Sequence, residues 1–144
     1  ADGSGIKVRV ATTDDGIYEQ DETISLSVSA PDQTTEAVGT GSITDNEAAP
    51  VVSRISSPST DEGGELTYEI GLDKVSSTDT TVSLTLADGS GSVADDADTA
   101  YEYSVDGGAT WQSLSLDGGG NADVVVPAGS SDGIEVRVPT TDDT

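Results

Sequence analysis

A segment that occurs twice constrains this chain of 144 residues more than any other feature. The chain contains IKVRVATTDD at residues 6–15 and repeats it as IEVRVPTTDD at residues 134–143, with eight of ten positions identical and a glycine before each copy. Self-similarity at a fixed spacing is typical of tandem repeats. We therefore predict a repeat with a period of 128 residues, of which this chain holds one period and an overlap.

Alternation of apolar and polar residues predicts that the chain forms β-strands. The clearest alternating segments are residues 6–10, 24–28, 66–72 and 82–86, and the weaker ones are residues 38–43, 51–55, 101–105, 111–116, 122–126 and 134–138. Turns rich in Gly, Asp and Ser separate them, and no segment carries the apolar stripe of a helix. Many short strands of this kind predict an all-β fold, an antiparallel β-sandwich.

The composition argues against several classes of function. The chain has 28 Asp and Glu against 5 Lys and Arg, a formal net charge of −23, so nucleic acid and anionic membranes are not expected as partners. The absence of His and Cys argues against a zinc or copper site. No nucleophile elbow occurs, and nothing marks an apolar pocket that would separate the pKa values of two paired carboxylates, so we do not expect an enzyme.

Acidic residues gather where the predicted strands end. The acidic stretches are residues 12–22, 44–47, 60–65, 87–89, 94–98 and 140–143. Calcium takes roughly six to eight oxygen ligands, often from flexible loops, and clustered carboxylates repel one another unless a cation lies among them. Neither the EF-hand register nor the G-G-x-G-x-D nonapeptide occurs. We predict Ca²⁺ at these loops, with solubilising surface charge as the alternative.

Several runs of residues resemble a known family. The chain contains VRVATTDDGIYEQDETISLSV, then GTGSITDNE, then ISSPSTDEGGELTYEIGL, in an order and spacing similar to Calx-β repeats. Together with YSVDGGATW and VPAGSSDGIEVRVPTTDD, they resemble the tandem extender repeats of giant bacterial RTX adhesins, which type I systems secrete. The resemblance implies an immunoglobulin-like sandwich that binds Ca²⁺ near repeat junctions, is extracellular at the bacterial cell surface, and has neighbouring repeats of the same polypeptide as partners.

The resemblance also assigns calcium ligands. Carried over position by position, they are Asp14, Asp15, Glu19, Glu22, Asp45, Asn46, Glu47, Glu62, Asp88, Asp142 and Asp143. Gln20 stands where the family often has an acidic residue or Gly, and Asn46 replaces an aspartate, so fewer charges reach the site. The acidic run at residues 94–98 has no counterpart that we can assign.

The expected function is a structural one. Calcium would stiffen each repeat and its junction, so that the repeats form a rod that projects a distal module from the cell. The alternative is a module that binds carbohydrate, a surface or ice, suggested by the Thr-rich residues 78–86. A flat array of outward Thr side chains would favour that alternative, although Thr is also an ordinary strand former.

The stretch EAAP at residues 47–50 is the best candidate for a boundary between repeats. Residues 1–48 are then the C-terminal part of one repeat, and residues 49–144 the N-terminal part of the next. Three arrangements are open: residues 1–48 pack as an additional unit, close onto residues 49–144 as a permuted sandwich, or complete a neighbouring molecule by strand complementation. The last two are favoured.

Overall fold

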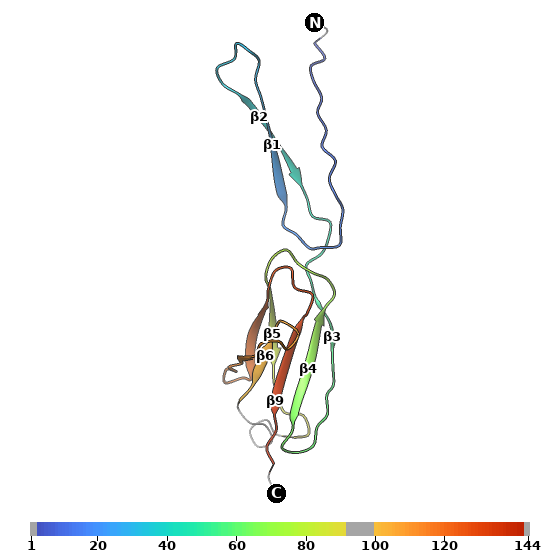
Figure 1. Cartoon of the computed structure of the whole chain (residues 1–144), viewed down its shortest axis with the longest axis vertical. Coiled ribbons are helices and arrows are strands. Elements are labelled where there is room, and N and C mark those ends of the chain that lie inside the picture. Colours follow the sequence, from blue (N-terminus) through green and yellow to red (C-terminus); the bar gives the residue numbers. More distant parts are fainter. Residues whose placement is uncertain (1–2, 92–99, 143–144) are drawn as a thin grey trace.

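The protein is described here by a computed structural model that covers residues 3–91 and 100–142 (Figure 1). These residues are all β, with antiparallel sheets, and they contain no helix that is long and apolar enough to cross a membrane. Residues 3–48 form an arm that projects from one end of a body, which comprises residues 49–91 and 100–142. The prediction of an all-β, antiparallel chain is confirmed.

The body contains two antiparallel sheets. The larger has the order β3-β4-β9-β6-β7, and the smaller pairs β5 with β8. The strands are β3 (Val52–Ile55), β4 (Glu65–Leu72), β5 (Thr80–Thr85), β6 (Glu102–Ser104), β7 (Gln112–Ser113), β8 (Asn121–Val126) and β9 (Ile134–Pro139). The second copy of the repeated segment thus forms β9, which lies between β4 and β6 and pairs with both.

One apolar cluster joins the two sheets. Its buried members are Ile70, Val82, Leu114, Val124, Val126, Ile134, Val136 and Val138. Along β9 every second residue belongs to this cluster, as the period of a strand requires. The alternation read from the sequence therefore marks the core positions of β9, whereas Ile55 of β3 stays exposed.

The arm has a different character. Among the described strands, β1 (Glu22–Val28) and β2 (Ala37–Ile43) of the arm pair only with each other, as a hairpin joined by residues 29–36. Residues 3–15 run beside the hairpin in an extended form (Figure 1). The strand predicted at residues 6–10 is wrong for this copy, because no described strand lies in position to exchange backbone hydrogen bonds with it.

The two copies of the repeated segment occupy opposite environments. Ile6, Val8 and Val10 are 92%, 62% and 65% exposed, whereas Ile134, Val136 and Val138 are 1%, 8% and 4% exposed. The half-buried face predicted for β1 is also exposed, since Leu26 at its centre retains 48% of its surface in contact with solvent. The first copy and its hairpin therefore have an apolar face without a core.

Hydrogen bonds hold the base of the arm to the near end of the body. The backbone N–H of Tyr18 donates to the carbonyl of Val75 at 3.0 Å, and the N–H of Ser77 donates to the carbonyl of Tyr18 at 2.8 Å. The Lys74 ammonium donates to the carbonyl of Ala48 at 3.0 Å. We call this set of contacts the joint. It leaves the arm outside the body rather than closed onto it.

Candidate functional site

A small polar cavity of about 110 Å³ lies at the base of the arm, and we call it the acidic cavity. It is lined by residues 12–15, 19, 20 and 22, around the start of β1, and by residues 43–47, at the end of β2. The antiparallel register places Glu22 opposite Ile43, so the hairpin itself brings these two segments together. Most of its polar side chains are carboxylates.

Asp45 lies at the centre of the hydrogen bonding around the acidic cavity. One carboxylate oxygen accepts the backbone N–H of Glu19 at 2.8 Å, and the other accepts the N–H of Glu47 at 3.2 Å. The N–H of Asp45 in turn donates to the side chain of Asp21 at 3.1 Å. Sequence reasoning missed Asp21, although it lies within the acidic stretch 12–22 that marked the region. Its role is to position the backbone of Asp45.

A second contact crosses between the same two segments. The Asn46 amide donates to an oxygen of Asp14 at 3.1 Å, and the Asp15 side chain accepts the N–H of Ile17 at 2.9 Å. Asn46 therefore offsets part of the charge of Asp14, while its own carbonyl oxygen is available as a further ligand. The Asn46 amide therefore has a physical role at a position where the family that the sequence resembles has an aspartate.

The electrostatics of the acidic cavity favour a positive charge. Desolvation raises the pKa of Glu47, and the hydrogen bond and charge of Asp45, followed by the charges of Asp14 and Asp15, raise that pKa further. The pKa of Asp45 is lowered, chiefly by the hydrogen bond from the N–H of Glu19, against the opposing effect of desolvation. A carboxylate that is repelled by three neighbours gains from any cation placed among them.

The donor chemistry of the cavity fits calcium. Carboxylate, amide and hydroxyl oxygens are hard ligands, and they lie on loops, which suits the flexible coordination of Ca²⁺. Within residues 3–91 and 100–142, however, no three acidic side chains are arranged so that they could hold a metal ion as they stand. Binding would therefore draw these solvent-accessible side chains closer together.

The predicted ligands divide into groups in space. Seven of them line the acidic cavity: Asp14, Asp15, Glu19, Glu22, Asp45, Asn46 and Glu47. Asp142 lies elsewhere, against Gly63, which follows Glu62 in the chain, and nearby the N–H of Thr140 donates to the carbonyl of Gly64 at 2.8 Å. Asp88 follows β5 and does not line the acidic cavity. Asp143 and residues 94–98 lie outside the described residues.

Comparisons of the chain with protein-family models, with curated proteins and with solved structures find no match. A proposal for its function therefore depends on the residues, the contacts and the electrostatics given above. The acidic cavity is the place where all three converge.

Proposed function

We propose that this chain is a calcium-binding extender repeat of a bacterial cell-surface adhesin, built on an immunoglobulin-like β-sandwich of the Calx-β type. One observation carries the proposal: seven predicted calcium ligands, from two segments about 30 residues apart, line a single cavity. The raised pKa of Glu47 also supports it, because desolvation, and then the neighbouring Asp45, Asp14 and Asp15, disfavour its charged form, and a cation among them would offset these effects. Neighbouring repeats of the same polypeptide would be the partners, and the location would be extracellular.

The position of the acidic cavity suggests how calcium would act. Asp14, Asp15, Asp45 and Glu47 would hold the ion, which supplies the positive charge that offsets their mutual repulsion. The wall formed by residues 12–22 includes Tyr18, whose backbone is hydrogen-bonded to Val75 and Ser77 of the body. The wall formed by residues 43–47 is followed by Ala48, whose carbonyl accepts a hydrogen bond from the Lys74 ammonium. Drawing the two walls together would therefore stiffen the joint between arm and body.

Affinity in the extracellular range would suffice for this role. Calcium-binding modules outside cells commonly have dissociation constants of about 0.1–1 mM. Low calcium inside the cell would leave the joint loose, and higher calcium outside would stiffen it. The result would be a rod that becomes stiff after secretion.

The alternative of a ligand-binding module receives less support. The exposed residues of β5 are Thr81, Ser83 and Thr85. The Ser83 hydroxyl donates to Asp123 at 2.8 Å, and the Thr85 hydroxyl donates to Asn121 at 2.8 Å. Two of these three hydroxyl groups therefore bond within their own sheet instead of presenting an open array of Thr.

Calorimetric titration of the metal-free full chain with Ca²⁺ tests the proposal. The double variant Asp45→Asn/Glu47→Gln should lose at least one bound ion per chain, or bind it at least about tenfold more weakly. The matched control Asp32→Asn/Glu36→Gln removes the same charge from the loop at the other end of the hairpin and should bind as the wild type does.

Thermal unfolding completes the test. Calcium should raise the midpoint of the wild type and of the control by mass action, and should raise that of the cavity variant less. An unchanged midpoint together with no measurable heat of binding would refute the proposal. An equal loss of calcium binding in the cavity variant and in the control would contradict a site at the acidic cavity, because the net charge of the chain alone would then explain the binding.

A further inference from the structure

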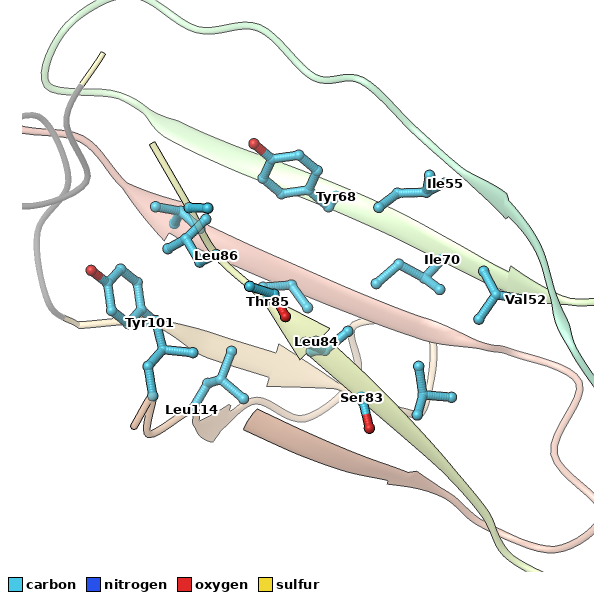
Figure 2. Close-up of a pocket in the computed structure, with 15 residues that line it drawn as sticks. Val52, Ile55, Tyr68, Ile70, Ser83, Leu84, Thr85, Leu86, Tyr101 and Leu114 are labelled. Carbon is cyan, nitrogen blue, oxygen red and sulfur yellow. The ribbon is translucent and has the colours of Figure 1, made fainter. Parts of the chain in front are cut away.

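An apolar cleft of about 430 Å³ opens in the body between its two sheets. Figure 2 shows Ile55, Tyr68 and Ile70, from β3 and β4, on one side of this cleft and Leu84 and Leu86 on the other. Clefts that are lined chiefly by apolar side chains are common binding sites in proteins. The architecture around the cleft indicates what kind of partner that is.

The edge of β5 forms one rim of the cleft. Residues 82–87 all border the cleft. Consecutive side chains of a strand point to opposite faces, so one face alone would contribute only every second residue. The strand therefore presents its edge to the cleft. Among the described strands β5 pairs only with β8. The N–H of Leu86 donates to Gly120 on the β8 side at 2.8 Å, so by alternation the N–H of Thr81 points toward the free edge. The cleft can therefore accept a further strand.

The hairpin of the arm has an apolar face that is exposed to solvent. Ile24, Leu26, Val28 and Val38 are all about half exposed or more. An open groove of about 690 Å³ lies between this face and the extended residues beside it. A two-stranded hairpin alone is at best marginally stable in water. Adding to the edge of the β5–β8 sheet would make a four-stranded sheet and would cover the apolar face of the hairpin with the cleft.

The repeated segment indicates which cleft the hairpin fits. Residues 6–15 precede β1 in the arm, and nearly the same sequence in the body forms β9, whose Val136 and Val138 line the cleft. Equivalent sequences are expected to take equivalent places in a fold. A hairpin of the β1–β2 type therefore belongs beside a body that contains β9.

Charge points to the same pairing. In a chain with a net charge of −23, most surfaces repel a second copy. The strands β1 and β2 carry only one charged residue, Glu22, and β5 carries none. The hairpin and the free edge can therefore meet without bringing like charges together.

We propose that the cleft accepts the β1–β2 hairpin of a second copy of this chain, with one hairpin strand adding to the free edge of β5. The hairpin of the same copy is held away from the cleft by the joint, and it points away from the body (Figure 1). Residues 6–10 of the incoming copy stay outside, because β9 already fills the place between β4 and β6. The contact joins two different surfaces, so association extends head to tail.

Light scattering and sedimentation of the full chain, from micromolar to millimolar concentration, test this contact. The average mass should rise with concentration above the 14.5 kDa of one chain. Leu26→Asp places a charge on the hairpin face, and Thr81→Pro removes a donor from the free edge. Each variant should weaken association about tenfold or more. Val125→Asp adds the same charge at an exposed apolar residue of β8 outside the cleft and should have no effect.

Mixing the two variants gives the decisive result. Leu26→Asp retains an intact cleft and Thr81→Pro an intact hairpin, so the mixture should form a one-to-one dimer at concentrations where each variant alone is monomeric. Trp111 fluorescence during urea unfolding checks that each variant is folded. All measurements are made both with calcium and with chelator, so that a failure of the calcium proposal is seen separately.

Three results would overturn the inference. The first is a wild-type chain that stays monomeric at every concentration, both with calcium and with chelator. A monomer whose hairpin is protected from hydrogen exchange, because it has closed onto its own body, counts as this result. The second is association that Leu26→Asp and Thr81→Pro leave unchanged, or that Val125→Asp weakens equally. The third is a mixture of the two folded variants that forms no dimer.

Discussion

The two copies of the repeated segment allow one substitution to be made twice in nearly the same local sequence. Ile134 is 1% exposed in β9, and Ile6 is 92% exposed in the arm. Replacing each by Ala removes the same atoms from opposite environments. The local propensities barely differ, so any difference in the free energy of unfolding measures tertiary burial.

The expected magnitudes follow from that burial. Ile→Ala removes about three methylene equivalents, worth about 0.8 kcal/mol each, and a rigid core adds a cavity term. Ile134→Ala should therefore lower the free energy of unfolding by about 3–4 kcal/mol. Ile6→Ala should change it by less than about 0.5 kcal/mol, as is usual for an exposed site.

Urea unfolding followed by the fluorescence of Trp111 provides the assay. This single tryptophan lies in the body, with the Arg137 guanidinium carbon 3.9 Å from its ring centroid, and Arg137 belongs to β9. Loss of β9 packing therefore changes its surroundings directly. A cost above about 1 kcal/mol for Ile6→Ala at low protein concentration would refute the reasoning, because the first copy would then be packed in solution. Equal costs for the two variants would refute it as well.

Two further predictions use the same unfolding assay. The pKa of Asp106 is lowered to about 2, first by the hydrogen bond from the Thr110 hydroxyl. The charged Asp106 side chain therefore stabilises the fold at pH values above its ordinary pKa of 3.8, and this stabilisation is lost as pH falls through about 2. The difference in free energy of unfolding between wild type and Asp106→Asn should accordingly be constant near neutral pH and shrink steadily as pH falls from about 4 to below about 2, and a difference independent of pH would contradict this. Gly133 has a φ of +69°, and a Cβ there would overlap the carbonyl oxygen of Ile70, so Gly133→Ala should cost more than about 2 kcal/mol. Gly5 has a φ of +68° in open space, so Gly5→Ala should cost at most about 1 kcal/mol, and similar costs at the two positions would show that the close approach to Ile70 is unimportant.

Much of the body could be predicted from alternation alone. The segments expected around Ile70, Val82, Val124 and Ile134 all became strands with those residues in the core. The strand expected at residues 111–116 is reduced to β7, two residues long. Period two predicts a strand reliably where neighbouring strands take up its hydrogen bonds, and fails where they do not.

The acidic cavity was only partly accessible to sequence reasoning. Acidic stretches marked both of its walls, but their contact depends on the hairpin register that places Glu22 opposite Ile43. The same charge pattern marked Glu62 and Asp142, which belong to another part of the body, where Asp142 lies against Gly63. The acidic run at residues 94–98 lies outside the described residues.

The sequence by itself determined the strand-forming pattern, the acidic loops and the equivalence of two segments 128 residues apart. It could not determine that one copy would be core and the other surface. Alternation specifies which side chains share a face of a strand, whereas burial requires other strands to cover that face. Only the tertiary structure decided that Ile134 has such a cover and that Ile6 does not.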